Sequence, residues 1–537
     1  MDNEGAGEIR TTRGRVVMLV DNAVQGDSRV QKEARSAAEA GWDVTLLGIL
    51  SNASPQETWT IGDATVRLIR VPRPLGQHPM LMRRSLRRPL AYRPGRYAAQ
   101  RVNAVKAWQW EIRQRRAVLD AARRAGGSPL RHLAGRLWLV PLRAVAKAVG
   151  LWARFRAGEL SRLQRARQDP DAPITRISMG FWQRLMGQRS WRRLDPGLWD
   201  YELAFGRVVD SLKPDLIHAN DFRMVGVGVR AAQRARARGR DVKVVWDAHE
   251  YVAGVTGRAD NPRWLPAQIA YTAEYAPQAD AVVTVSSTLA ELLQQVHRLP
   301  ERPQVVLNAP SGPSGEAAGE PAPDLRTLCG IGPETPVLVY CGGVNPSRGV
   351  DLMVDALPQL PGVHVALVTL HPSGNNAASE ELLARAVELG VGDRVHLLPY
   401  VPHWQVSAFL ATANAGVVPI QHKPNHELAL ITKYLEYSHA RLPIVCSDVR
   451  TMAETTRSTG QGEVFRAGDL ADYVRAVRAV LADPERYRAA YDRPGLLEGW
   501  TWEAQAEVLD QVYRRLRPDV APAKVAEERV VLDPAIV

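Results

Sequence analysis

Two segments in the second half of the chain combine glycines with charged side chains in a pattern that suits the binding of a diphosphate. The first is YCGGVNPSRGVDLMVDAL (340–357), where Gly342 and Gly343 follow an apolar run and Arg348 stands just before a predicted helix. Glycines let a ligand approach the backbone, N–H groups at a helix start favour an anion, and a guanidinium can bind two phosphate oxygens. Taken alone, an ordinary strand-to-helix turn explains this segment equally well.

The second segment, KPNHELALITKYLEYSHARLPIVCSD (423–448), places Glu436 three residues after Lys433. This spacing puts both side chains on one face of a predicted helix. The carboxylate can accept hydrogen bonds from two ribose hydroxyls, and the lysine can face phosphate. An isolated helical ion pair is the alternative, but the two segments together favour a single binding site.

Apolar strands alternate with amphipathic helices around both segments, a pattern typical of parallel sheets covered on both faces. We expect two doubly wound α/β domains with a cleft at the carboxyl ends of their strands, where such folds bind ligands. The predicted strands are 15–20, 43–49, 215–221, 242–250 and 281–287, then 336–343, 363–369, 394–400, 415–420 and 442–448.

The domain boundaries follow from shifts in composition. Residues 309–324 are rich in Pro, Gly, Ala and Ser, which is typical of a linker. The predicted parts are an N-terminal domain (1–308), a linker (309–335), a C-terminal domain (336–495), a helix that crosses back to the N-terminal domain (496–516) and a flexible tail (517–537).

Composition narrows the class of protein. A chain of 537 residues is too long for one core, and its three cysteines lie far apart without a CxxC pair, so neither a zinc site nor a disulfide framework is expected. No run of about 18 apolar residues suggests a membrane span, and no secretory signal pattern is found at the N-terminus. We therefore expect a cytoplasmic protein without a bound metal.

The net charge of +12 is concentrated in one part of the chain. Residues 73–168 hold 23 Lys or Arg against three acids, a net +20, so the remaining residues carry −8. This excess belongs to a predicted helical insert at about 73–200 and favours an anionic partner. The insert also contains the Asp-x-Asp at 169–171, which we expect to lie in a loop.

A narrow basic stripe on an otherwise apolar helix is predicted from Leu133 onward. With 100° between residues, the basic side chains fall within about 40° of one another; they are Arg136, Arg143, Lys147 and Arg154. This pattern is typical of a helix lying on an anionic membrane surface. Pro141 should kink or divide the helix. Packing on the protein itself or on a partner is the alternative, and the lack of a recognition motif argues against nucleic acid.

The two motifs and the paired α/β domains resemble the retaining glycosyltransferases of family 4 (group 1), which have the GT-B fold of two Rossmann-like domains facing a cleft. The resemblance covers most of the chain apart from 73–200 and the two ends. It implies that Gly342, Gly343, Arg348 and Lys433 bind the diphosphate of a nucleotide-sugar donor and that Glu436 binds its ribose.

The sequence departs from the family pattern at two positions. Gly343 stands where the family has an arginine, and Leu428 stands where it has its first glutamate, with Glu427 one residue before. Arg348 occupies the position of the family lysine and keeps its positive charge.

In the N-terminal domain, the resemblance of WDAHEYVAG (246–254) to a family segment nominates His249 as the catalytic residue that reaches the donor sugar. A histidine satisfied by its neighbours is the alternative there, and we expect such a structural role for His218. Residues predicted at the cleft or on the acceptor side are Gly26, Asp27, Arg29, Glu250 and Glu427.

The resemblance implies a reaction in which a sugar passes from a nucleotide-diphosphate donor to a glycan or lipid-linked acceptor with retained configuration. No metal, cofactor or protein nucleophile is implied, because the leaving diphosphate helps to deprotonate the acceptor. The basic insert favours attachment to the inner face of the cell membrane. Two other hypotheses are a catalytically silent scaffold or sugar-nucleotide sensor, and a nucleotide-sugar epimerase.

Overall fold

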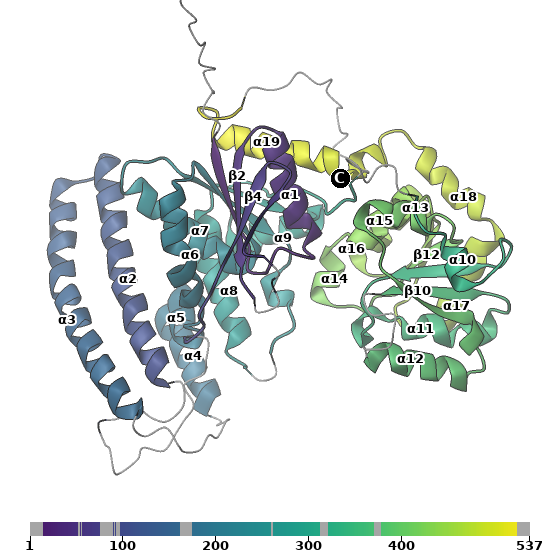
Figure 1. Cartoon of the computed structure of the whole chain (residues 1–537), viewed down its shortest axis with the longest axis horizontal. Coiled ribbons are helices and arrows are strands. Elements are labelled where there is room, and N and C mark those ends of the chain that lie inside the picture. Colours follow the sequence, from purple (N-terminus) through teal and green to yellow (C-terminus); the bar gives the residue numbers. More distant parts are fainter. Residues whose placement is uncertain are drawn as a thin grey trace, which may run out of the picture. The chain divides into compact units, whose positions relative to one another are not determined.

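The chain folds into two compact α/β units, which are described separately (Figure 1). A computed structural model describes residues 14–51, 54, 56–75, 90, 92, 97–161, 174–258, 261–311, 321–369 and 377–522. Most of the first unit comes from residues up to Val283, and most of the second from Gln304–Leu509. The helix α19 (Trp502–Leu516) contributes its first half to the second unit and its last residues, from Asp510, to the first.

The first sheet has the strand order β3-β4-β2-β1-β5-β6-β7-β8. Its strands are β1 (Arg15–Leu19), β2 (Asp43–Ile49), β3 (Thr58–Ile61), β4 (Ala64–Ile69), β5 (Leu216–Asn220), β6 (Lys243–Ala248), β7 (Ala281–Thr284) and β8 (Gln304–Val305). β1 lies between β2 and β5 and pairs parallel with both, and β5 pairs parallel with β6. The carboxyl ends of β1, β5 and β6 therefore lie at the same edge.

The second sheet, β11-β10-β9-β12-β13-β14, is entirely parallel. Its strands are β9 (Val337–Cys341), β10 (His364–Thr369), β11 (Val395–Pro399), β12 (Ala415–Val418), β13 (Ile444–Ser447) and β14 (Gly462–Phe465). Separate hydrophobic cores cover its two faces, one including α15 (Thr432–His439) and the other α17 (Leu470–Ala482). The predicted α/β class with parallel sheets is confirmed.

Four of the described strands were not predicted from the sequence, namely β3, β4, β14 and the two-residue β8. β3 and β4 form an antiparallel hairpin, and the burial of β4 alternates along ATVRLI, so the strand lacks a continuous apolar run. β14 has only four residues, GEVF, of which Phe465 alone is fully buried. An edge strand with one exposed face carries too few apolar residues to stand out from a loop.

Two long helices form most of the described insert, α2 (Tyr97–Arg124) and α3 (Pro129–Ser161), followed by α4 (Ile174–Met186). α2 packs on α7 (Asp221–Arg236), and α3 lies on the outer side of α2 (Figure 1). Pro141 lies within α3 without dividing it. Pro141 is exposed, and as a proline it donates no hydrogen bond to the carbonyl of Leu137 one turn before it. The predicted loop at 169–171 lies outside the described residues.

Two predicted boundaries need correction. The short helix α10 (Leu325–Cys329) lies in the predicted linker, yet Leu325 is fully buried in a core of the second unit. The predicted flexible tail begins with an anchored segment, because Arg517 donates to the carbonyls of Asp215 at 2.8 Å and Asp241 at 2.6 Å. Both segments are polar in sequence, and the few contacts that fix them come from residues distant in the chain. Residues 523–537 lie outside the described residues.

Gly416 in β12 has no side chain, which lets α15 pack close to this strand. A Cβ atom added to Gly416 would lie 2.5 Å from the Tyr437 ring, which is closer than real contacts allow. Tyr437 is also tied to the end of β9, where its Oη accepts a hydrogen bond from the Cys341 N–H at 2.9 Å. Gly416 and Tyr437 therefore set the position of the helix that carries Lys433 and Glu436.

We expect Gly416→Ala to lower the melting temperature of the protein, because overpacking of a core costs about 1–3 kcal/mol. Differential scanning calorimetry provides the measurement. Gly332→Ala is the matched control, since a Cβ there meets nothing within 4 Å. Equal melting temperatures for the two variants would contradict the close packing of α15 on β12.

Candidate functional site

A buried ion pair occupies the carboxyl edge of the first sheet. Asp247, near the end of β6, is fully buried, and Arg29 in the first turn of α1 (Ser28–Glu39) is almost so. Arg29 Nε lies 2.9 Å from Asp247 Oδ2, and its Nη2 lies 3.1 Å from Oδ1. The sequence predicts Arg29 at the surface of a binding site, whereas the structure places it beneath the surface as the partner of Asp247.

Asp27 positions the start of α1. Its carboxylate accepts a hydrogen bond from the Val30 N–H at 3.3 Å and another from the Asn22 side chain at 2.7 Å, which makes it the helix N-cap. Gly26, just before it, has φ +82°, a left-handed conformation that glycine adopts without strain, and faces open space. The loop thus fixes Arg29 while leaving Gly26 accessible.

His249 lies between two carboxylates. Its Nε2 is 3.1 Å from Asp247 Oδ2 and its Nδ1 is 3.1 Å from Asp221 Oδ1. Burial lowers the pKa of His249, but Asp247 and Asp221 outweigh that effect and raise it well above its usual value. The two carboxylates therefore favour the charged form of the imidazole. The Nε2 atom of His249 is buried, whereas the side chains of His249 and Asp221 are each 20% exposed.

The ionised state of Asp247 depends on its neighbours. Burial alone would raise the pKa of Asp247, but Arg29 and His249 hold it well below its usual value. Glu33 lies in the same cluster, with its Oε1 3.0 Å from Arg29 Nε. Burial and the charge of Asp247 raise the pKa of Glu33 well above its usual range.

His218 has the structural role expected from the sequence. It is fully buried, and its Nδ1 lies 2.6 Å from the hydroxyl of Tyr513 on α19. Burial lowers the pKa of His218, so the ring is neutral at physiological pH. Through His218, whose Nε2 is 3.7 Å from Asp247 Oδ2, the end of α19 belongs to the same cluster.

Three side chains in this cluster lie close enough to bind one metal ion, namely Glu33, Asp247 and His249. The donor set does not suit a metal, because the guanidinium of Arg29 already holds both oxygens of Asp247 and places a fixed positive charge there. A divalent cation would have to displace Arg29 from a buried position. The geometry thus fits an ion-pair network better than a metal centre.

Asp221 and Arg223 are site residues that the sequence analysis missed. Asp221 follows β5 directly and has φ +62°, a strained conformation for a residue other than glycine. Arg223 forms an ion pair with Asp21. Glu250 lies beside them, and burial together with the charge of Asp221 raises its pKa. The strand-end sequence DLIHAND contains Asp221, but nothing in it indicates the turn that aims this carboxylate at His249.

In the second unit, the structure brings Gly342 and Lys433 together. Gly342 follows β9 with φ +148°, and an added Cβ would lie 2.3 Å from Lys433 Cε. The lysine side chain therefore runs along the glycine backbone. Burial, followed by the charge of Glu436, raises the pKa of the Cys341 thiol to about 12, while Lys433 acts in the opposite direction. Both charged groups thus lie near the end of β9.

Arg348 reaches the same strand end from a short 3-10 helix, η5 (Pro346–Arg348). The N–H of Gln421 donates to the Ser347 carbonyl at 3.0 Å, which ties this turn to the segment after β12. The charge of Arg348 acts on the Tyr340 hydroxyl, which itself donates to the Gly343 carbonyl at 3.0 Å. The predicted diphosphate-binding residues are therefore neighbours in one unit.

Glu427 is held in place by hydrogen bonds to neighbouring residues of the second unit. Its Oε1 lies 2.6 Å from His422 Nδ1, and its Oε2 accepts from the Arg450 N–H at 2.7 Å, at the start of α16 (Arg450–Thr459). His422 Nε2 lies 3.0 Å from Asp448 Oδ1. The hydrogen bond with Glu427 raises the pKa of His422. Glu427 thus stabilises a helix N-terminus, and sequence analysis missed His422 and Asp448 as its neighbours.

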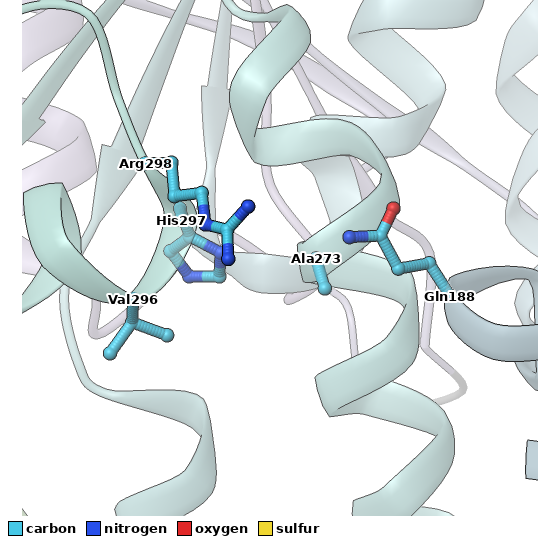
Figure 2. A pocket seen from close by; sticks show the side chains of 5 residues that line it. All are labelled: Gln188, Ala273, Val296, His297 and Arg298. Atoms are coloured by element: carbon cyan, nitrogen blue, oxygen red, sulfur yellow. The ribbon is translucent and has the colours of Figure 1, made fainter.

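A cavity of about 290 Å³ in the first unit lies apart from these residues (Figure 2). Its lining is Gln188, Ala273, Val296, His297 and Arg298, with the histidine and arginine on one side and Gln188 across from them. Burial lowers the pKa of His297 to about 4, so the ring is uncharged. None of the residues predicted from the sequence lines this cavity.

Two family models match this chain, one mostly within the first unit and one within the second. The family model described as Glycosyltransferase Family 4 matches residues 164–309, and that described as Glycosyl transferases group 1 matches residues 335–483. D-inositol 3-phosphate glycosyltransferase 1 of Catenulispora acidiphila is 26% identical over 56% of this chain and 72% of its own length. Glycogen synthase of Mycobacterium tuberculosis is 26% identical over 66% of this chain and 80% of its own.

Solved structures show the same fold. Sucrose-phosphate synthase from Thermosynechococcus elongatus has a TM-score of 0.57 at 15% identity and covers 94% of this chain and 100% of its own. HepE from Anabaena, crystallised with UDP and glucose, has a TM-score of 0.54 at 12% identity with the same coverage. The fold is GT-B. The chain belongs to the family 4, group 1 glycosyltransferases.

We expect Asp221→Asn to lower the pKa of His249, because it removes one of the two carboxylates that favour the charged ring. Asparagine tolerates the left-handed conformation at this position, so the backbone should stay in place. The titration is followed by NMR of the histidine Cε1–H groups, with His249→Gln identifying the signal. Asp241→Asn, an exposed carboxylate on the same unit, is the control. An unchanged pKa in Asp221→Asn would contradict the assigned pairing.

We expect Asp247→Asn to destabilise the first unit by about 3–5 kcal/mol, because it leaves the Arg29 charge buried without its partner. The double variant Arg29→Met/Asp247→Asn should recover part of this loss. Calorimetric unfolding of the two single variants and the double variant provides the measurement. If the double variant lost as much free energy of unfolding as Arg29→Met and Asp247→Asn together, Arg29 and Asp247 would not stabilise one another.

Proposed function

We propose that this glycosyltransferase transfers a sugar from a nucleotide-diphosphate donor to a glycan or lipid-linked acceptor, with retention of the anomeric configuration. The observation that carries the proposal is the close approach of Lys433 to Gly342 at the end of β9, with Glu436 one helical turn further along α15. Positive charge, accessible backbone and a carboxylate thus occur together in one unit. This combination suits a diphosphate attached to a ribose.

The donor-binding roles follow from the chemistry of each group. Arg348 and Lys433 neutralise the diphosphate, and Gly342 and Gly343 let it approach the backbone. Glu436 accepts hydrogen bonds from the ribose hydroxyls. The neighbour from Anabaena was crystallised with UDP and glucose, which supports a sugar nucleotide as the co-substrate of this protein.

The reaction breaks the bond between the anomeric carbon and the diphosphate oxygen. The acceptor oxygen then forms its bond on the same face of the sugar, and its proton passes to the leaving diphosphate. Arg348 and Lys433 stabilise the negative charge that develops on the diphosphate, so this scheme requires neither a metal nor a protein nucleophile. No further cofactor takes part.

We assign the contact with the donor sugar to His249 of the first unit. Its Nδ1 faces the Asp221 carboxylate at 3.1 Å, and that carboxylate, held by the histidine, is an acceptor for a sugar hydroxyl. Gly26, Asp27 and Glu250 are assigned to the acceptor side, while Arg29 positions Asp247 beneath His249. Relatives named for inositol phosphate and glycogen support a hydroxyl-rich acceptor. We place the reaction in the cytoplasm.

We expect one of UDP, GDP, ADP or their sugar conjugates to raise the melting temperature of the protein. At a concentration of about 100 times Kd, binding contributes roughly 2.7 kcal/mol of stability. The shift should disappear in Arg348→Ala and Glu436→Gln and persist in Arg457→Ala and Glu381→Gln, which change exposed residues on other helices. A shift that survives both site substitutions would contradict the assigned donor site.

A further inference from the structure

The outer helix of the insert, α3, exposes a continuous apolar face. Its large exposed side chains are Leu130, Leu133, Leu137, Trp138, Val140, Val145, Leu151, Trp152 and Phe155. Trp138 is 72% exposed and Leu137 is 62% exposed. With 100° between residues and a rise of 1.5 Å, the face spans an arc of about 160° and a length of about 38 Å without a charged residue. Soluble proteins rarely leave so long an apolar surface uncovered.

A row of positive charges borders this face on one side, formed by Arg136, Arg143, Lys147 and Arg154. Among the described residues, none forms an ion pair with Arg143 or Lys147. Arg136 shares Asp120 with His132, at 3.3 Å and 2.8 Å respectively. The border therefore keeps net positive charge that is available to an external anion.

A cavity of about 430 Å³ lies where the basic border meets the apolar face. Arg116 of α2 and Arg136 and Arg143 of α3 line it, together with apolar side chains that belong to α3. These apolar residues are Leu133, Leu137, Leu139 and Val140. Guanidinium groups beside apolar carbon match a phosphate headgroup and the first part of its acyl chains.

The apolar face is not needed to hold the insert on the protein. α2 provides that attachment, since Gln114 Nε2 donates to the Arg230 carbonyl at 3.2 Å and Glu111 pairs with Arg230 at 3.2 Å. α3 packs on α2 through its opposite side, where Leu139, Ala146 and Ala153 are buried. Among the described residues, no other segment covers the exposed face, which can therefore contact another surface.

We propose that α3 lies in the headgroup region of a membrane containing anionic phospholipid, with its apolar face toward the acyl chains and its basic border on lipid phosphates. Among the described residues, no helix is long and apolar enough to cross a bilayer, so α3 would lie along the surface. The charge decides against a second copy of the chain as the occupant, because residues 73–168 carry a net +20 that opposes self-association. The proposal is independent of the donor and acceptor chemistry.

Vesicle flotation with the full-length chain tests this proposal. We expect binding to phosphatidylcholine vesicles that contain phosphatidylglycerol, weaker binding at high salt, and little binding to phosphatidylcholine alone. Arg143→Ser/Lys147→Ser should lower the partition coefficient by roughly thirtyfold. Trp138→Ser/Trp152→Ser should abolish binding. Val387→Ser/Arg457→Ser, which changes an exposed valine and an exposed arginine of the second unit, should bind like the wild type.

Three results would overturn the proposal. The first is failure of the wild type to float with phosphatidylglycerol vesicles at low salt, and the second is wild-type binding by Trp138→Ser/Trp152→Ser. The third is a dimer, seen by size-exclusion chromatography, that this variant dissociates without any vesicle binding, because a second copy would then cover the face. Equal melting temperatures of the variants and the wild type establish that the substituted chains are folded.

Discussion

The buried negative charge of Asp247 is the constraint around which the first unit is built. A carboxylate without access to water needs compensating charge, and Arg29 and His249 provide it from α1 and from the segment after β6. In the same cluster, burial raises the pKa of Glu33 and lowers the pKa of His218, so it opposes a charge on either group. The raised pKa of His249 is thus a consequence of how α1, β6 and the start of α7 pack together.

The second unit depends on a different constraint, namely the room available between α15 and the sheet. Gly342 and Gly416 have no side chain where Lys433 and Tyr437 of α15 approach the sheet. The helix can therefore place a lysine and a glutamate at the end of β9, beside the turn that carries Arg348. In both units the side chains that we propose as functional lie at the carboxyl edge of a parallel sheet, where strand ends and helix starts meet. The helical insert adds a surface whose chemistry is independent of either site.

Much of the fold was predictable because buried parallel strands are continuous apolar runs, and the predicted runs correspond to every described strand except β3, β4, β8 and β14. The hairpin β3–β4 was missed because its alternating pattern lacks such a run. Pairing between residues that are distant in the chain was harder to predict from the sequence. Arg29 and Asp247 are 218 positions apart, and nothing near either residue indicates that the arginine is buried. The left-handed turn at Asp221 depends likewise on tertiary packing.

The residues of the second unit were nominated through family resemblance, and their spacing alone did not distinguish a binding site from an ordinary turn.

Time-resolved proton NMR of a sugar nucleotide mixed with the protein, with and without candidate acceptors, tests the central claim most directly. The anomeric protons of donor, product and isomer give separate signals. We predict that the donor signal decays as nucleoside diphosphate is released and that the new glycosidic signal has the donor's anomeric configuration. A donor that binds but stays unchanged would contradict the account in favour of a sensor, and an isomer formed without acceptor would contradict it in favour of an epimerase.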